Sequence, residues 1–388
     1  MKDELEKLLN RGVDRIYPSK EAFEKVLRSG KKLKLYQGFD PSMPSLHLGN
    51  YVGALKLSQF QKLGHKVIFL VGDFTGMIGD PSDKLAVRKK LTREEVLQNS
   101  KIWKDQVSRM LDFDGPNPAE IKYNSDWLDK VTFKELIEIT SNFTVQQMIE
   151  RDMFQERIKN NTPIYLHEFL YPVSVAIDCV EMDVDLEIGG TDQTFNMLAG
   201  RTLMKALKNK DKYVLTTKLL VDKDGNKIGK TTGNALFLDS TPENFFAGIM
   251  SFPDEVIELG FELLTEFPLE GLKKQIDENP LNMKKRLAFK VVNIIWGKDD
   301  AKNSQEYFER TVQKGDLPKE LDTLQVSNTE TLLDAVAKYI GSKSEAKRLL
   351  QQKAIEVNEK VVTEPGLELK GGEVLKIGKK TFVKIKTK

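Results

Sequence analysis

The sequence predicts an α/β protein in which a parallel sheet is followed by a helical region and a small α+β module. A buried strand over 33–36 leads through a loop with one glycine and two prolines into a helix that opens at 45–50. The nearly unbroken apolar run 66–71 is typical of a strand that is covered on both faces. From about 242 to 314 the periodicity is helical, and short strand patterns return near the C-terminus.

Composition limits the class of protein. The 388 residues are 40% hydrophobic and 30% charged, which suffices for a core and for about two or three domains. We find no apolar run long enough to cross a bilayer and no signal-like amino terminus, so we expect a cytoplasmic protein without a membrane segment. One cysteine, Cys179, excludes an internal disulfide, and with three histidines a Cys/His zinc site is not expected.

The junction between the first strand and the first helix of the sheet is the first candidate site. A helix amino terminus presents unpaired N–H groups and the positive end of the helix dipole, so a phosphate can bind there. His47 and Asn50 are expected on the first turn of this helix. The alternative is an ordinary βα turn that Ser45 caps.

Two further strand ends carry glycines and acidic residues. Segment 72–82 follows the apolar run, and its glycines allow the backbone to come close to a ligand, although the spacing is not G-x-G-x-x-G. The strand 186–188 leads into Gly189-Gly190-Thr191-Asp192-Gln193, where the acid suits a ribose hydroxyl. Both segments lie where open α/β sheets bind ligands.

A helix predicted over 171–178 places Tyr171, Val175 and Asp178 on one face. A carboxylate on such an apolar face needs a partner. Asp178 is therefore either satisfied by a nearby amide or accepts a hydrogen bond from a hydroxyl or amine of a substrate.

Basic residues occur in two loops. Lys84 and Arg88 lie in a basic segment just before a capping box at Thr92 and Glu95, where they either meet phosphate or are solvated. Lys227 and Lys230 flank a glycine in a second loop, which suits a clamp on a polyphosphate whose charge rises during phosphoryl or nucleotidyl transfer. This loop lacks the spacing of a P-loop.

Two helices predicted between Phe133 and Phe154 carry apolar residues that indicate core or a dimer interface rather than a ligand site: Phe143, Val145, Met148, Ile149 and Met153. A polar connection over 313–331 then leads to the last module. There, a basic amphipathic helix over 344–352 precedes short strands, and lysines crowd the C-terminus. The lysines either attract a polyanion such as RNA or belong to a solvated edge strand.

Together these motifs resemble the bacterial-type tyrosyl-tRNA synthetases over essentially the full chain. His47-Leu-Gly-Asn50 is similar to the class I HIGH signature, and Lys227-Ile-Gly-Lys230-Thr231 is similar to the KMSKS-type signature. Segments 36–42, 76–82 and 189–193 resemble further blocks of the family, and the chain from about 328 resembles the S-four RNA-binding domain.

The resemblance implies three domains. These are a Rossmann-like parallel-sheet catalytic domain over 1–236 with a dimer-forming helical insertion at about 128–165, an α-helical anticodon-binding domain over 237–322, and an S-four-like domain over 328–388. It also implies the partners tyrosine, ATP and tRNA(Tyr), and a homodimer. Mg²⁺ is expected with ATP, without a dedicated protein metal site.

The implied reaction has two steps: tyrosine and ATP give tyrosyl-adenylate and pyrophosphate, and the tyrosyl group then passes to the terminal ribose of the tRNA. The tyrosine carboxylate attacks the α-phosphate directly, so catalysis depends on positioning and on stabilising phosphate charge. By resemblance, catalysis involves His47, Asn50, Lys84, Arg88, Lys227, Lys230 and Thr231. By resemblance, the ATP-binding set is Gly38, Asp40, His47, Gly49, Asn50, Gly190, Asp192, Lys227 and Lys230.

The resemblance also assigns residues to the other two substrates. Tyr36 and Asp178 match the pair that binds the phenol hydroxyl, and a pair that phenylalanine leaves unpaired rejects that amino acid strongly, as the tyrosyl enzyme itself exemplifies. Tyr171 and Asp80 match the ligands of the ammonium group, and Gln193 belongs to the same subsite. The tRNA would contact Lys347, Arg348 and Lys380.

Several positions depart from the family pattern. Asn50 replaces the second histidine of HIGH, Gln37 stands where a small residue is common, and Asp83 stands where glycine is usual. Val175 replaces a glutamine that contacts the ammonium group, and Ile177 replaces a common tyrosine. We expect tyrosine to remain the substrate, with Asp80 and Tyr171 holding the amine.

Two alternatives differ in substrate or in kind. A tryptophanyl-tRNA synthetase shares the fold and the signatures, but the Tyr36/Asp178 pair and the C-terminal module argue against it. A synthetase-like protein that has lost catalysis and binds structured RNA is the other alternative. The lysines in both phosphate loops argue against that one.

Overall fold

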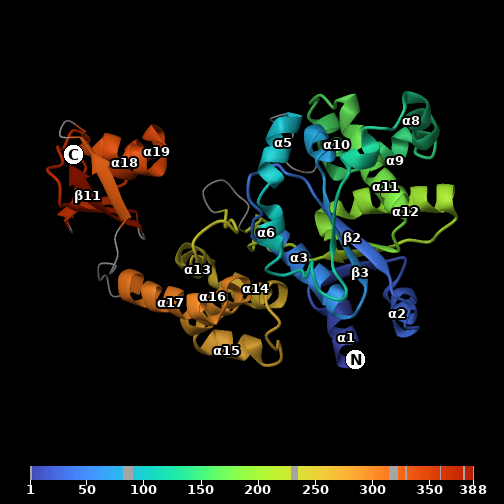
Figure 1. Cartoon of the computed structure of the whole chain (residues 1–388), viewed down its shortest axis with the longest axis horizontal. Coiled ribbons are helices and arrows are strands. Elements are labelled where there is room, and N and C mark those ends of the chain that lie inside the picture. The colour runs from blue at the N-terminus through green and yellow to red at the C-terminus, as the bar shows by residue number, and fades with distance from the viewer. Residues whose placement is uncertain are drawn as a thin grey trace. The chain divides into compact units, whose positions relative to one another are not determined.

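The computed structural model describes residues 2–81, 91–228, 235–313, 322–327, 330–358, 360–378 and 381–387. The chain forms two compact units (Figure 1). The first contains Met1–Thr241 and Ser251–Trp296, and the second contains Pro242–Met250 and Gly297–Lys388.

The first unit is built on a six-stranded sheet with the order β1-β6-β5-β2-β3-β4. Strand β1 pairs with β6 in antiparallel fashion, and the other neighbours are parallel. This confirms the predicted α/β class with a mostly parallel sheet. The strands are β1 (Val13–Tyr17), β2 (Lys34–Phe39), β3 (Lys66–Val71), β4 (Glu120–Tyr123), β5 (Leu186–Gly190) and β6 (Tyr213–Thr217).

The order of the strands reverses at β2. From β2 the chain proceeds through β3 to β4 on one side, while β5 and β6 continue the sheet on the other side. Residue Tyr36 of β2 pairs with Ile68 of β3 and with Glu187 of β5. A crevice at the carboxyl ends of β2 and β5 is where open α/β sheets bind ligands.

The helices of the first unit cover this sheet. Helix α3 packs against β2, β3 and β5, while α11 and α12 pack against each other (Figure 1). The helical segments are α1 (Lys2–Asn10), α2 (Lys20–Arg28), α3 (Leu48–Lys62), α4 (Thr75–Ile78), α5 (Arg93–Ser100), α6 (Trp103–Val107), α7 (Ser125–Leu128), α8 (Phe133–Thr140), α9 (Val145–Ile149), α10 (Asp152–Lys159), η2 (Leu166–Phe169), α11 (Leu170–Met182), η3 (Thr191–Gln193), α12 (Thr194–Lys208), η4 (Asp254–Val256), α14 (Ile257–Leu264), α15 (Leu272–Glu278) and α16 (Pro280–Trp296).

Residues 251–296 cluster with the first unit because the N-terminal part of the chain binds them. The Arg11 guanidinium donates to the carbonyl oxygens of Phe261 at 2.6 Å and Phe267 at 2.7 Å. The Tyr51 hydroxyl of α3 donates to the Leu264 carbonyl at 3.0 Å. The bonds to Phe261 and Leu264 satisfy two of the last carbonyls of α14, which lack partners inside the helix.

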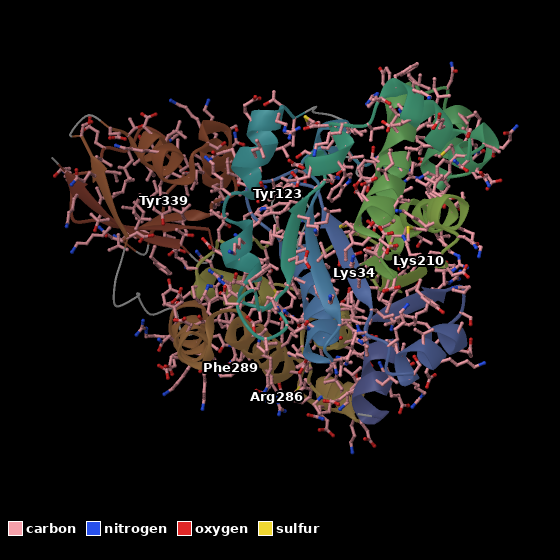
Figure 2. The ribbon with its side chains drawn as sticks, turned by 45° about the vertical axis from the view of Figure 1, so that its right-hand side comes forward. Lys34, Tyr123, Lys210, Arg286, Phe289 and Tyr339 are labelled. Atoms are coloured by element: carbon pink, nitrogen blue, oxygen red, sulfur yellow. The ribbon has the colours of Figure 1, made fainter. Side chains whose placement is uncertain are left out.

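Charged groups join β2 to β5 at the end of the strands opposite the crevice. Asp185 accepts a hydrogen bond from the backbone N–H of Lys34 at 2.9 Å and forms an ion pair with Lys210 at 3.3 Å (Figure 2). The backbone N–H of Lys34, the side chain of Lys31 at 3.0 Å and the charge of Lys210 hold the pKa of Asp185 below its usual value despite its partial burial. The Asp185 carboxylate thereby fixes the start of both strands.

The helix boundaries differ from the sequence prediction in four places. The first is the cap of α3, which is His47 and not Ser45. The segment after Thr92 forms two helices, α5 and α6, although the predicted capping box of Thr92 and Glu95 is present. The region 133–159 holds three helices rather than two, and one turn, α4, begins inside the glycine-rich segment after β3.

The second unit joins two helices to a small α+β module. Its sheet has the order β7-β11-β10-β8-β9, with β7 parallel to β11. Its core includes Leu332, Ala335, Ile355 and Leu375, which are fully buried. The elements are α13 (Pro242–Met250), α17 (Lys298–Phe308), the π-helical turn η5 (Glu309–Gln313), β7 (Asp322–Val326), α18 (Leu332–Ile340), α19 (Lys343–Gln351), β8 (Ile355–Val357), β9 (Lys360–Val361), β10 (Val374–Ile377) and β11 (Thr381–Thr387).

The structure of this unit differs from the sequence prediction in its polar connection, and it contradicts the edge-strand alternative for the C-terminal lysines. The polar connection 313–331 contains a strand, β7, and the Tyr339 hydroxyl donates to Asp322 of that strand at 2.6 Å (Figure 2). The lysine-rich strand β11 lies between β7 and β10, so it is not an edge strand. Alternation explains this position: Val383 and Ile385 of β11 are buried, while Lys384 and Lys386 are exposed.

Candidate active site

Two neighbouring cavities lie at the crevice between β2 and β5. The larger encloses about 290 Å³ and the smaller about 50 Å³. Both are lined by Gln37, Gly38, Asp40, Tyr171 and Gln193. The larger cavity has the size of a ligand site, and the shared lining makes the smaller one its extension.

His47 and Asn50 line the larger cavity at the start of α3. His47 Nδ1 accepts hydrogen bonds from the backbone N–H groups of Gly49 at 3.0 Å and Asn50 at 3.3 Å. The Asn50 side-chain oxygen in turn accepts a hydrogen bond from the backbone N–H of His47 at 3.0 Å. Because Nδ1 is an acceptor, the ring carries its proton on Nε2 and can donate it to an anion. The sequence predicts that backbone N–H groups at this helix start bind a phosphate. Because His47 Nδ1 accepts from two of these N–H groups, the imidazole Nε2–H is the donor that remains for the phosphate.

Lys227 and Asp192 face the same cavity from opposite loops. Lys227 Nζ donates to Asp192 Oδ2 at 2.6 Å. A β-bridge between Lys227 and Val221 holds the lysine, and Asp192 lies in the turn η3 directly after β5. A Cβ added at Gly190 would lie 2.5 Å from the Asp192 carboxylate, so glycine is needed beside it. Lys227 and Asp192 therefore form an ion pair in the lining of the larger cavity.

Asp40, at the end of β2, connects the two cavities. Its Oδ1 accepts from the Thr75 hydroxyl at 2.6 Å, and its Oδ2 accepts from the Tyr171 hydroxyl at 2.8 Å. Burial, together with the charge of Asp40, raises the pKa of Tyr171 well above its usual value. Tyr171 therefore stays protonated and donates to Asp40, which the sequence analysis assigned to ATP.

Asp80 also lines the larger cavity. Its Oδ2 accepts from Gln193 Nε2 at 2.6 Å, and its Oδ1 lies 3.8 Å from the guanidinium of Arg151. The Arg151 side chain is 5% exposed and its guanidinium also lies over the rings of Phe154 and Phe195. Asp80 thus has both a hydrogen-bond donor and a buried cation as partners.

Tyr36, Asp178 and Val175 line the smaller cavity. Asp178 accepts from the indole N–H of Trp127 at 2.7 Å and from the Asn124 amide at 3.3 Å. Burial raises the pKa of Asp178 well above its usual value, although both N–H donors oppose this. Burial also raises the pKa of the Tyr36 hydroxyl well above its usual value. The smaller cavity is therefore lined by both a buried phenol and a buried acid.

The structure brings most of the predicted site residues together. Those that line one or both cavities are Tyr36, Gly38, Asp40, His47, Gly49, Asn50, Asp80, Tyr171, Asp178, Gly190, Asp192, Gln193 and Lys227. Lys347 and Arg348 lie on α19 of the second unit. Lys84, Arg88, Lys230, Thr231, Lys380 and Asp83 fall outside the described residues.

Sequence reasoning missed several residues that touch the site. Asn124 and Trp127 directly follow β4, so a polar residue after a strand end was the signal that could have found them. Thr75 lies in the glycine-rich segment 72–82; the glycines indicated this segment as a ligand site, but no pattern singled out Thr75 within it. No pattern pointed to Arg151, because its contacts join segments that are far apart in the sequence.

Among the described residues, no group of three or more His, Cys, Asp or Glu side chains could hold a metal ion. In the same part of the chain, no helix is both long and apolar enough to cross a membrane.

An open parallel sheet with a ligand-sized cavity at its switch point is characteristic of nucleotide-binding α/β enzymes. A family model described as tRNA synthetases class I (W and Y) matches residues 28–313, and one described as S4 domain matches residues 331–375. The chain belongs to the class I tRNA synthetases of this W and Y family.

Bacterial relatives match nearly the whole chain. The tyrosine–tRNA ligase of Geobacter metallireducens is 40% identical over 97% of this chain and 97% of the relative. The tyrosine–tRNA ligases of Aquifex aeolicus and Thermotoga maritima are 38% and 37% identical, over 98% and 99% of this chain and 97% of each relative.

Solved structures agree on the fold. A C-terminally truncated mitochondrial tyrosyl-tRNA synthetase from Coccidioides posadasii aligns with a TM-score of 0.65 at 21% identity, covering 78% of this chain and 91% of that one. A tyrosyl-tRNA synthetase from Archaeoglobus fulgidus, solved with L-tyrosine, aligns with a TM-score of 0.60 at 18% identity, covering 78% and 99%.

Proposed function

We propose that this enzyme is a tyrosine–tRNA ligase that first joins tyrosine to ATP and then transfers the tyrosyl group to tRNA(Tyr). The observation that carries the proposal is that Tyr36 and Asp178 both line a small cavity that extends the larger one. A phenol that enters the smaller cavity can bond both groups, whereas a benzyl ring leaves them unpaired. The relatives named above are tyrosine–tRNA ligases of nearly the same length.

In the first step the tyrosine carboxylate oxygen forms a bond to the α-phosphorus of ATP. The bond from phosphorus to the bridging oxygen breaks, and pyrophosphate leaves. His47 donates from Nε2 and Lys227 supplies a positive charge, so that both stabilise the negative charge that grows on the phosphate oxygens. Mg²⁺ would accompany the ATP and neutralise part of that charge.

The ammonium group of tyrosine would lie among Asp40, Asp80 and Tyr171. Asp40 and Tyr171 line both cavities, so they lie where the amino acid passes from the smaller into the larger one. Two carboxylates suit one ammonium ion, and Asp40, which lines the smaller cavity together with Val175, would supply the acceptor that the valine lacks. We therefore extend the role of Asp40 from ATP to the amine of the substrate.

The ribose and adenine would occupy the larger cavity. Asp192 suits a ribose hydroxyl once ATP draws Lys227 toward its phosphates, and Gly38, Gly49 and Gly190 leave the nucleotide space. Gln37 lies against α3, where a Cβ at Gly53 would meet its amide at 2.2 Å. Lys84, Arg88, Lys230 and Thr231 complete the phosphate site in this proposal.

A homodimer is supported by exposed apolar side chains on α8, α9 and η2. Phe133 is 79% exposed, Val145 69% and Leu166 81%, and Ile137 and Tyr165 are more than half exposed. A soluble monomer gains nothing from such a patch, and a second copy would cover it. Of the apolar residues predicted here, Met148 is buried and Phe143 packs against the core, so Val145 alone is strongly exposed.

The second unit would bind the tRNA. The region that resembles an S-four domain contains α19, whose Lys347 and Arg348 lie on the exposed side, and Lys380 belongs to the same basic module. Arg348 is paired with Glu345 at 2.5 Å on the same helix, a contact that a phosphate can displace because exposed pairs are weak. We retain the three predicted domains in this proposal. We also propose a cytoplasmic location, which suits a tRNA substrate and a chain with a single thiol.

Amino-acid-dependent ATP–pyrophosphate exchange with tyrosine, tryptophan and phenylalanine tests the proposal. We expect exchange with tyrosine, with phenylalanine disfavoured by a factor on the order of 10⁴. Exchange that favours tryptophan would make the chain a tryptophan enzyme. Absence of exchange together with tRNA binding would support an RNA-binding protein without catalysis.

A further inference from the structure

A buried charged cluster lies behind the hydroxyl of Tyr36. Lys212, which is 0% exposed, forms an ion pair with Glu187, and its Nζ also donates to Cys179 Sγ at 3.0 Å. Cys179 Sγ lies 3.4 Å from Glu187 Oε2 and 3.1 Å from Tyr36 Oη. The thiol therefore links the ion pair to the phenol of the smaller cavity.

The surrounding helices leave space for this cluster. A Cβ added at Gly200 of α12 would lie 2.5 Å from Cys179 Sγ, 2.6 Å from Lys212 Nζ and 3.4 Å from Glu187 Oε2. Lys212 Nζ also donates to the Met197 carbonyl of α12 at 3.1 Å. A residue larger than glycine would displace the thiol and the ammonium together, so the packing of α12 against α11 is built around them.

The protonation states of Cys179 and Lys212 suit a fixed chain of hydrogen bonds from the Lys212 ammonium group through the Cys179 sulfur to the Tyr36 hydroxyl. Burial next to Glu187 raises the pKa of the Cys179 thiol to about 12, so the thiol stays protonated at neutral pH. The neighbouring Glu187 carboxylate raises the pKa of Lys212 despite its burial, so Lys212 stays an ammonium ion. The Lys212 ammonium group donates a hydrogen bond to the Cys179 sulfur, and the sulfur in turn contacts the Tyr36 hydroxyl. Of these three residues, Tyr36 lines the smaller cavity.

We propose that Cys179, held by the Glu187–Lys212 pair, is a positioning residue that fixes the Tyr36 hydroxyl and thereby sets the preference for tyrosine over phenylalanine. The inference rests on the proposed function. A hydroxyl that is held in place loses no rotational freedom when a substrate phenol binds it, whereas a loose one must be ordered first. Phenylalanine makes no bond to this hydroxyl, so its activation does not depend on Cys179.

The test compares Cys179→Ala and Cys179→Ser with the unaltered enzyme in ATP–pyrophosphate exchange. For Cys179→Ala we expect the KM for tyrosine to rise about tenfold, with kcat and the KM for phenylalanine nearly unchanged. Cys179→Ser keeps a polar group at the same place and should restore most of the preference. Ser174→Ala, on the same helix α11 but outside the lining of both cavities, is the matched control and should leave the preference unchanged.

A double-mutant cycle separates positioning from general damage. In a Tyr36→Phe background, which lacks the hydroxyl, Cys179→Ala should cause no further loss of preference. An equal loss in both backgrounds, or an unchanged preference in Cys179→Ala alone, overturns the inference. If Cys179→Ala does not fold, a double variant with Glu187→Gln and Lys212→Gln removes both charges of the ion pair together. This variant should show the same tyrosine-specific rise in KM, and an unchanged KM would refute the proposal. An unaltered enzyme without tyrosine-selective exchange would instead refute the proposed function.

Discussion

The ammonium group of Lys227 donates a hydrogen bond to the carboxylate of Asp192 at 2.6 Å. Lys227 belongs to the motif predicted to bind ATP phosphates, and Asp192 was predicted to bind the ribose. Each group satisfies the charge of the other, at a contact where the lysine side chain is 36% exposed. ATP would therefore replace this ion pair with one ion pair, between a phosphate and the lysine, and one charge-assisted hydrogen bond, from a ribose hydroxyl to the acid.

Lys227→Ala should lower kcat of tyrosine-dependent ATP–pyrophosphate exchange roughly 100-fold, with little change in the KM for tyrosine. The reason is that a charge aimed at the transition-state phosphate contributes more there than in the ground state. Steady-state exchange kinetics measure both constants. Lys223→Ala, an exposed lysine in the same turn, is the control and should retain full activity; an equal loss there would point to a general change of the loop.

Asp178→Asn should lower kcat/KM for tyrosine by roughly 10- to 100-fold, because a hydrogen bond to a charged or strongly polar group is lost in a buried site. The amide also places an N–H group toward the donors of Trp127 and Asn124. Exchange assays with tyrosine and phenylalanine check this. Unchanged tyrosine-dependent exchange would show that Asp178 does not bind the substrate phenol.

Phe133→Glu combined with Val145→Glu should convert a dimer into a monomer, because two carboxylates would be buried without partners at the proposed interface. Sedimentation equilibrium or light scattering measures the mass. Leu281→Glu changes another half-exposed leucine, on α16, and should leave the mass unchanged. A monomeric unaltered protein would contradict the proposed dimer.

His65 makes stability depend on pH. It is 5% exposed, and its Nδ1 accepts from the backbone N–H of Leu33 at 3.1 Å. Burial, with a smaller contribution from Lys32, lowers the pKa of His65 from 6.5 to about 4. Between these two values the unfolded chain binds more protons than the folded one, so the free energy of unfolding falls as the pH falls from 6.5 to about 4.

The contribution of His65 to this loss is on the order of 1 to 3 kcal/mol, because its pKa lies near 4 in the folded protein and near 6.5 in the unfolded chain. Urea unfolding followed from about pH 7 to about pH 4.5 measures it. His65→Gln keeps an acceptor for Leu33 but cannot titrate, so its stability should depend less on pH over this interval. An identical slope in the variant would assign the effect to other groups.

Deletion of residues 328–388 should abolish salt-sensitive binding of tRNA and retain adenylate formation, because the cavities lie wholly in the first unit. Filter binding over a range of salt concentrations, next to ATP–pyrophosphate exchange, tests both activities. Loss of both would refute this division of labour. Loss of neither would remove the C-terminal module from the tRNA site.

Local patterns determined much of this protein. The apolar run of β3, the helical spacing that places Tyr171, Val175 and Asp178 on one face, and the glycine-acid ends of β3 and β5 were all readable, because such features depend on neighbours in the sequence. The same holds for the capping box of Thr92 and Glu95. Resemblance then joined these segments into one site.

Contacts between distant segments were decided only by the tertiary structure. The position of β11 inside its sheet and the strand β7 both depend on strand pairings that local patterns do not specify. Likewise, Asp40 meets Tyr171, Arg151 meets Asp80, and Cys179 meets Tyr36 across more than 70 residues of chain. The sequence therefore determined which chemical groups are present and on which face they lie, while packing decided which of them touch, because burial forces each polar group to find a partner wherever the fold places one.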